Sequence, residues 1–372
     1  MNQRTDNQEV TGAKRRQREV SSCERTGKRS EKQKHLYLVL DDWSKGFTIH
    51  KIDDDDGDDA DLREPGVLRV FTPVTGRCMT FDAIGSNIFI TTNPRCGRTP
   101  SVIYNTEASG LAVGPPRPEP LLGDSYMSIS TADTLYAFQH YITDPQQFLQ
   151  VMSWAPTDND DPWAPRPTMD WGWQGVDSPW PFPNNEIIAS YSLHPDGHTI
   201  FFSAHSKYDN PNPKSIRTFS FDTKHRRWRS HGEWSLPFRD QGHFDTMLDA
   251  WVGLNKDGFI CSCQVPSRSS SGHQPPDCKM LQERLLCSPP RGGVPATTAT
   301  LTHVGNDAKF CLVECVLRDG DHAFGRDGCT LHITTFGLKY SHKGELQTMD
   351  RVTNSYTVSK HAPLFSPVAF WM

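Results

Sequence analysis

The sequence predicts an all-β protein, a β-propeller with six blades. A two-strand unit recurs five times between residues 77 and 317: an apolar strand, a short polar turn and a second apolar strand. The turns follow one another at intervals of roughly 46 to 63 residues, close to the length of one propeller blade. Glycine and proline number 27 and 28 of the 372 residues, which suits a chain with many turns. No segment shows a sustained helical period.

The two ends of the predicted propeller domain are expected to meet in one blade. The apolar run at 36–40 begins a set of strands that continues at 47–52 and 67–71, but no strand precedes it. Residues 365–371 are apolar although they end the sequence. We therefore expect 365–371 to pair with 36–40, which closes the ring and leaves no long open edge. With this blade the count is six.

The other five blades follow in order and are expected to begin near residues 77, 124, 187, 243 and 298. Their hairpin turns lie at 85–87, 131–134, 194–198, 255–258 and 305–308. In the third of these turns, Pro195, Asp196 and Gly197 stand between two apolar runs. Each of these residue types favours the backbone conformations of a tight turn. We therefore interpret His194 and Asp196 as turn residues rather than as a catalytic pair. Trp228, after the strand at 218–223, is expected to anchor its blade in the core.

Residues 1–34 are expected to form a disordered basic tail ahead of a propeller domain at 35–372. The tail holds ten lysines and arginines against five acidic residues, and it has almost no apolar residues. It therefore buries too little surface to offset the entropy of ordering. Its run Lys14, Arg15, Arg16 and Arg18 is a candidate nuclear-import signal, with a solvated tail as the alternative.

The charge of the remaining chain argues against nucleic acid as a partner. The whole chain carries a net charge of -5, so residues 35–372 are acidic once the basic tail is set aside. No apolar run approaches the length of a membrane span. The cysteines lie scattered in strands and loops, and in a chain of this length without an apolar leader they indicate reduced thiols inside the cell. We expect a monomer in the cytoplasm, the nucleus or both.

No cofactor and no metal site is expected. The residues Cys261, Cys263, His273, Cys278 and Cys287 do not have the spacing of a structural zinc site, so we interpret the cysteines as packing thiols. The aspartate-rich run at 53–61 lacks the glycine at position six of a calcium loop, and self-repulsion favours a solvated loop. The sequence contains no nucleophile elbow, phosphate loop or dinucleotide fingerprint.

Six runs carry a family resemblance. They are HLYLVLDDW at 35–43, SLHPDGHTIF at 192–201, FSFDT at 219–223, GHFD with LDAWVG at 242–253, FCLVEC at 310–315 and FW at 370–371. Together they resemble a plant family of kelch-like propeller domains of unknown function that is expanded in cereal grasses. The resemblance covers roughly 35–372 and implies a kelch-like propeller, but no activity. The sequence departs from kelch repeats because it lacks the paired glycines that end their second strand.

The leading functional prediction is a protein-interaction scaffold that uses loops on one face of the propeller, because loops on a rigid scaffold often carry binding. Trp163, His243 and Asp245 are the candidate contact residues, and the partner is a protein of unknown identity. Trp163 lies in a tryptophan-rich and proline-rich stretch, and exposed aromatic residues mark recognition surfaces.

The alternative is an enzyme or a small-ligand binder whose site lies in the central channel. Polar residues near the ends of the first strands of the blades are its candidates: Asp82, His194, Asp249 and His303. Three or more of them within hydrogen-bond reach of one another would favour the enzyme. A second alternative is a paralogue that has lost its partner.

Overall fold

The computed structural model describes the chain from residue 34 to its end, with gaps. The described residues are 34–41, 46–52, 62, 66–71, 79–91, 100–122, 126–139, 149–156, 169–177, 181, 186–206, 216–268, 274–287, 297–305, 308–317, 329–358 and 366–372. The chain divides into two compact units, Met1–Gln33 and Lys34–Met372, and every described residue belongs to the second. The basic tail with Lys14, Arg15, Arg16 and Arg18, the acidic run at 53–61 and Trp163 lie outside the described residues.

The described part of the chain consists of β-strands joined by turns and loops, with one short 3-10 segment at Glu119–Leu121. The first three sheets each have four strands. Their strands are β24 (Val368–Trp371), β1 (Leu36–Asp41), β2 (Phe47–Ile52) and β3 (Leu68–Val70); β4 (Thr80–Ile84), β5 (Asn87–Thr91), β6 (Pro100–Asn105) and β7 (Gly110–Pro116); and β8 (Tyr126–Ser130), β9 (Thr134–Gln139), β10 (Leu149–Pro156) and β11 (Met169–Gly175).

The next sheet has eight strands, and the last has four. The eight-stranded sheet contains two antiparallel meanders that are joined by a parallel pairing of β12 with β16. Its strands are β12 (Glu186–Leu193), β13 (Thr199–Ser206), β14 (Ile216–Asp222), β15 (Arg227–Gly232), β16 (Asp240–Asp245), β17 (Ala250–Leu254), β18 (Ile260–Gln264) and β19 (Cys278–Met280). The last sheet holds β20 (Thr297–His303), β21 (Lys309–Leu317), β22 (Cys329–Tyr340) and β23 (Leu346–Val358).

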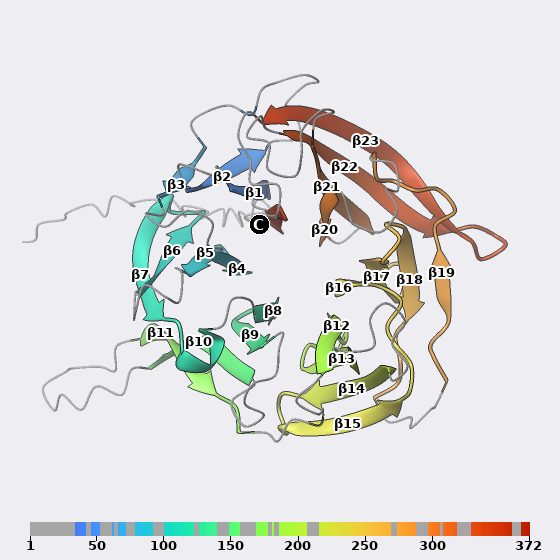
Figure 1. The fold of residues 1–372 in the computed structure, drawn as a ribbon, viewed down its shortest axis with the longest axis horizontal. Coiled ribbons are helices and arrows are strands. Elements are labelled where there is room, and N and C mark those ends of the chain that lie inside the picture. The colour runs from blue at the N-terminus through green and yellow to red at the C-terminus, as the bar shows by residue number, and fades with distance from the viewer. Residues whose placement is uncertain are drawn as a thin grey trace, which may run out of the picture. The chain divides into compact units, whose positions relative to one another are not determined.

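The sheets of the second unit stand around a common centre, as in a β-propeller (Figure 1). Strands β4, β8, β12, β16 and β20 lie nearest to the centre, and β3, β7, β11, β15, β19 and β23 lie at the outside (Figure 1). The prediction of an all-β propeller is confirmed by this arrangement. It places the first strand of each meander where side chains can line a central cavity.

The hairpin turns form where the sequence predicts them, for reasons that single residues explain. In the turn after β12, the Asp196 carboxylate accepts hydrogen bonds from the backbone N–H groups of His198 and Thr199, both at 2.8 Å. Gly197 adopts a φ of 74°, a conformation that glycine takes without the steric cost of a side chain. The interpretation of His194 and Asp196 as turn residues is confirmed.

Strand β24 lies against β1 in an antiparallel register from Leu36 opposite Trp371 to Val39 opposite Val368. The backbone N–H of His35 donates to the Met372 carbonyl at 2.7 Å, and the N–H of Met372 donates back to His35 at 3.1 Å. The end of the chain is therefore bonded to the first described strand. The paired strand begins at Val368, three residues later than the sequence predicts.

The core consists of apolar clusters between neighbouring sheets. Trp251 on β17 is fully buried, packs on Phe201 at 5.2 Å between ring centroids, and donates from Nε1 to the Leu193 carbonyl at 2.8 Å. Trp228 packs against Phe221 and Phe202, with ring centroids at 4.7 and 5.6 Å. The anchoring role predicted for Trp228 thus has a packing basis, although its side chain is only partly buried.

Candidate ligand site in the central cavity

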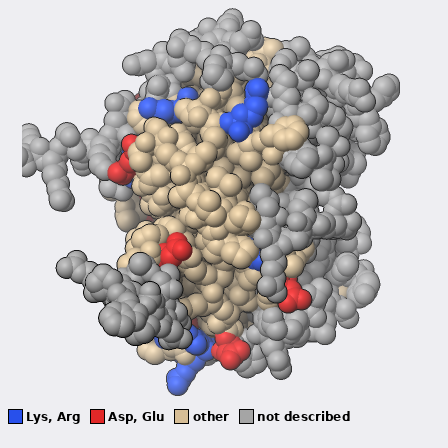
Figure 2. All heavy atoms as spheres, turned by 90° about the vertical axis from the view of Figure 1, so that its left-hand side faces the viewer, with Lys and Arg blue, Asp and Glu red and all other residues tan. Residues whose placement is uncertain are grey.

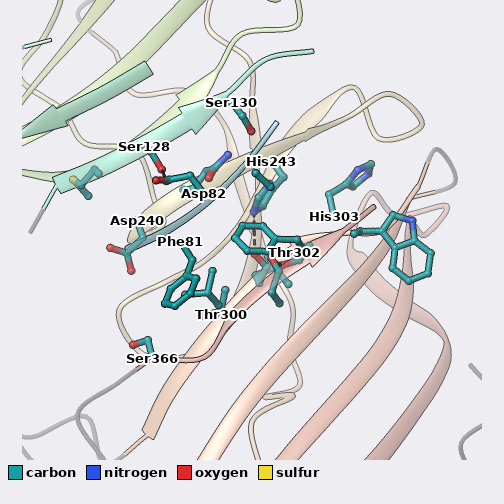
Figure 3. Close-up of a pocket in the computed structure, with 18 of the residues that line it drawn as sticks. Phe81, Asp82, Ser128, Ser130, Asp240, His243, Thr300, Thr302, His303 and Ser366 are labelled. Atoms are coloured by element: carbon teal, nitrogen blue, oxygen red, sulfur yellow. Dashed lines mark hydrogen bonds between the residues drawn. The ribbon is translucent and has the colours of Figure 1, made fainter. Parts of the chain in front are cut away.

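A cavity of about 910 Å³ opens at the centre of the second unit. Its wall is built mainly from the inner strands β4, β8, β16, β20 and β24 (Figure 3). The inner strands lie next to the cavity, so several consecutive residues of one strand line it, such as 79–83 around β4 and 299–303 of β20. The wall contains both polar groups and apolar side chains such as Phe81 and Phe370.

The first polar group of the wall is centred on Asp82 of β4, which is 5% exposed. Tyr126 Oη donates to one carboxylate oxygen at 2.5 Å, and Ser128 Oγ donates to the other. Thr80 Oγ1 donates in turn to Tyr126 Oη at 2.9 Å. Burial raises the pKa of Asp82, and the hydrogen bonds from Ser128 and Tyr126 only partly oppose this effect. The group is a carboxyl whose orientation is fixed from two sides (Figure 3).

Arg117 packs on the Tyr126 ring of this group. Its guanidinium carbon is 4.4 Å from the centroid of the Tyr126 ring, a cation–π contact. The side chain is buried, and Nε and Nη2 have no hydrogen-bond partner within the described residues. Burial lowers the pKa of Arg117, whereas the negative charge of Asp82 acts in the opposite direction. The arginine therefore supplies positive charge close to Asp82 without a direct ion pair between the two within the described residues.

The second polar group joins β16 to β20. Asp245 is fully buried, and its Oδ1 accepts hydrogen bonds from the backbone N–H groups of Met247 and Leu248, both at 2.9 Å. Its Oδ2 lies 2.9 Å from Nε2 of His303, a residue of the cavity wall. Burial alone would raise the pKa of Asp245, but the bond from His303 and the backbone N–H groups keep it below its ordinary value. The buried Asp245 carboxylate thus fixes the orientation of the His303 ring in the cavity wall.

His243 stands beside His303 in the wall (Figure 3). Its Nε2 lies 3.0 Å from the Leu301 carbonyl, so this nitrogen carries a proton and donates it. Burial, reinforced by the neighbouring His303, lowers the pKa of His243 to about 4. The ring is therefore neutral at pH 7, and its Nδ1 can act only as an acceptor.

The structure brings together some of the residues that the sequence singles out for the channel and separates others. Asp82 and His303 line the cavity. His194 lines a different hollow, and Asp249 lies exposed in the turn between β16 and β17. Two of the four channel candidates therefore share the cavity, which is fewer than the three that would favour an enzyme.

The three residues that the sequence proposes for a protein contact do not lie together on one described surface. His243 belongs to the cavity wall, Asp245 is buried beneath it, and Trp163 lies outside the described residues. Their role in a protein contact stays a prediction. The sequence did not single out Tyr126, Ser128 or Arg117, because a tyrosine in a strand and an arginine among prolines carry no recognisable signal for a site.

The cysteines in the described part of the chain are free thiols. Cys263 on β18 lies opposite Cys278 on β19, and Cys261 donates a hydrogen bond that lowers the pKa of the Cys278 thiol. Cys261, Cys263, Cys311 and Cys315 are buried, as expected of packing thiols. Within the described residues, no group of three or more histidine, cysteine, aspartate or glutamate side chains is placed to hold a metal ion.

The fold and the central cavity define a β-propeller protein. The chain belongs to the family described as protein of unknown function (DUF1668), whose model matches residues 33–356. A search of curated proteins found no match. Over the described part of the chain, no helix has the length and apolar character needed to cross a membrane.

Several solved structures are similar to the chain at low identity. A chain from a nidogen/laminin complex shares 10% identity with a TM-score of 0.44, and the match covers 87% of this chain and 97% of that one. A periplasmic gluconolactonase from Pseudomonas aeruginosa shares 13% with a TM-score of 0.41, over 87% and 97% of the two chains. The β-propeller domain of Cps50 (Swd1) from Myceliophteria thermophila shares 8% with a TM-score of 0.39, over 86% and 87%. Values this low assign neither an activity nor a partner to this chain.

Proposed function

We propose that this propeller binds a small neutral molecule with several hydroxyl groups in its central cavity. The observation that carries the proposal is that two oriented polar groups from different sheets line one cavity: Asp82 with Tyr126 and Ser128, and His303 held by Asp245. A pocket of several hundred cubic ångströms with a few fixed polar groups among apolar side chains is the usual form of a small-molecule site.

The chemistry of the wall favours a neutral, hydroxylated ligand. Asp82, His243 and His303 offer acceptors and donors in fixed orientations, and the hydroxyls of Ser130 and Thr131 add groups that serve as either. Phe81 and Phe370 supply apolar surface for the carbon skeleton of a ligand. Arg239 and Asp240, which also line the cavity, carry opposite charges, so the wall does not select strongly for an ionised molecule.

Binding is expected to depend on Asp82. In the Asp82→Asn variant, one carboxylate oxygen becomes an amide N–H₂ that cannot accept the bond from Tyr126 or Ser128, so the polar group loses its orientation. We expect affinity for the best binder in a library of mono- and disaccharides, measured by ligand-observed NMR and calorimetry, to fall at least tenfold. Thermal melting of the variant shows whether it remains folded.

The matched control is Asp249→Asn, the same chemical change in an exposed turn that does not line the cavity. This variant should bind like the unmodified protein. A library in which no compound binds the unmodified protein would contradict the proposal. A binder that tolerates Asp82→Asn as well as Asp249→Asn would contradict it too.

The second candidate function is the protein-interaction scaffold, and the outer strand β7 favours it. On the side of the unit that carries β7 and β11, the described residues are mostly uncharged (Figure 2). Leu111 and Val113 of β7 are 60% and 74% exposed, and Trp154 of β10 is 50% exposed. Unlike β3, β11, β15, β19 and β23, strand β7 contains no charged residue. Charges and prolines on outer strands discourage pairing with other chains. The two prolines of β7 stand at its end, so we propose that an extended segment of a partner protein adds to the edge of β7 along 110–113.

This second candidate is tested by a photo-crosslinking residue at position 113, with position 352 as the control. Val352 on β23 is also apolar and 55% exposed, but Asp350 and Arg351 flank it on the same strand. We expect crosslinks from position 113 that map to one segment of one partner and disappear with Leu111→Lys. Equal crosslinking at both positions, or none at position 113, would contradict strand addition.

The blade count and the closure of the ring are proposed as well. We propose six blades, counting the two meanders of the eight-stranded sheet separately, and a ring closed by β24; the β24–β1 pairing supports the closure. A kelch-like type and a plant origin follow from the sequence resemblance. A monomeric protein of the cytoplasm or nucleus remains the expectation for its state in the cell.

A further inference from the structure

A second hollow of about 610 Å³ lies between the two meanders of the eight-stranded sheet. One wall comes from β14 and β15 and the turn that joins them, and the other includes Arg268, which follows β18. The hollow shares no lining residue with the central cavity. Arg227, Arg229, Arg268, His194 and His225 bring basic or hydrogen-bonding nitrogen to its wall.

The strand pattern places two of these arginines on one side. Arg227 and Arg229 are two residues apart on β15, and alternate residues of a strand point to the same face. Trp228 between them is fixed by its packing on Phe221 and Phe202. In the register of the sheet, Arg227 lies opposite Asp222, and Arg229 lies opposite Ser220. The core contacts of the tryptophan therefore hold both arginines at the hollow.

The acidic groups near the hollow are already engaged. Asp222 accepts hydrogen bonds from the backbone N–H groups of Lys224 and His225 at 3.0 and 3.1 Å, and its other oxygen lies 2.8 Å from His225 Nδ1. Asp196 lies 3.1 Å from Arg268. By contrast, the side chains of Arg227 and Arg229 make no hydrogen bond or ion pair with any described residue.

We propose that this hollow is an anion site that binds the phosphoryl group of a phosphorylated small molecule. Arg268 is paired with Asp196, but Arg227 and Arg229 together face only Asp222, which leaves the wall with excess positive charge. Guanidinium groups match the geometry of phosphate oxygens and form paired hydrogen bonds with them. The volume of the hollow exceeds that of one phosphate and leaves room for the organic part of the ligand. This inference is independent of the ligand proposed for the central cavity.

The proposal is tested by calorimetric titration with inorganic pyrophosphate, glucose 6-phosphate and glucose. We expect both phosphates to bind at 0.1 M salt. Any heat from glucose reports the central cavity and should not change when arginines of the hollow are replaced. The double change Arg227→Gln and Arg229→Gln should weaken binding of the phosphates at least tenfold. A preference for glucose 6-phosphate would indicate an organic phosphate as the natural ligand, and a preference for pyrophosphate would indicate that the phosphoryl groups alone are recognised.

The control is Arg226→Gln, which removes one positive charge at a position next to Arg227 that does not line the hollow; it is compared with the double variant and with Arg227→Gln alone. It should change the affinity less than twofold. An equal loss in this variant would show diffuse attraction to a basic surface and would overturn the site, as would the absence of phosphate binding to the unmodified protein. If the double variant does not fold, the single change Arg268→Gln serves in its place, with an expected loss of several-fold.

Discussion

A chain that ends at Pro363 is expected to lose roughly 5 kcal/mol of unfolding free energy, by the apolar surface that β24 covers. Val368 and Phe370 pack with the apolar cluster of β1, β2, β4 and β5, and Trp371 packs with the cluster on the other side. The loss also breaks bonds to a neighbouring sheet, because Thr300 Oγ1 donates to the Pro367 carbonyl at 2.6 Å and Thr302 Oγ1 donates to Ala369 at 3.1 Å. Urea unfolding followed by tryptophan fluorescence measures the difference.

A point variant tests whether the strand itself, rather than chain length, carries this stability. Ala369 lies buried opposite Leu38 in the β1–β24 pairing, so Ala369→Glu places a charge in the core. It should destabilise the protein by a similar amount. Val352→Glu, on an exposed position of β23, should change stability little. A chain that ends at Pro363 and unfolds at the same urea concentration as the full chain would show that β24 does not close the ring.

The hairpins of this fold were predictable because local residues specify them. Gly85, Gly197, Gly258 and Gly305 all adopt positive φ in turns that the sequence marks with glycine, asparagine or aspartate. The parallel pairing of β12 with β16 was not predictable, because Ser190 and Asp240 lie in different meanders and meet only when the two meanders pack together. Local turn chemistry thus reveals the strands, while contacts between meanders depend on the whole chain.

The candidate site was predictable only where a titratable residue stands in an inner strand. Asp82 and His303 are titratable residues in inner strands that otherwise hold apolar and hydroxyl side chains, and both line the cavity. Arg117 reaches the site from a proline-rich segment after β7, and its contact with Tyr126 spans two sheets, so no local pattern announces it. His194 shows the opposite case, because its place near the end of an inner strand suggested the channel while the turn directs it to another hollow.

Replacing Asp245 by alanine is expected to cost about 3 kcal/mol of stability and to release His303 from its fixed orientation. The change leaves the buried backbone N–H of Leu248 without its acceptor and removes the partners of Met247 and His303, and each lost buried bond costs about 1–3 kcal/mol. Asp245→Asn retains an acceptor for the backbone groups and should cost about half as much. Asp249→Asn, four residues later in an exposed position, is the control and should leave stability unchanged.

The pH dependence of stability separates the contribution of the Asp245 charge from that of its hydrogen-bond geometry. The folded protein keeps the pKa of this carboxyl below the ordinary value of 3.8, so its ionised form stabilises the fold above that pH. That stabilisation is lost as pH falls through the folded pKa, because the protonated carboxyl resembles the amide of the asparagine variant. The stability gap between the unmodified protein and Asp245→Asn, measured by urea unfolding from pH 7 to pH 3, should therefore narrow below about pH 4. A gap that stays constant over this range would show that the carboxylate charge contributes nothing and that Asp245 acts through hydrogen-bond geometry alone.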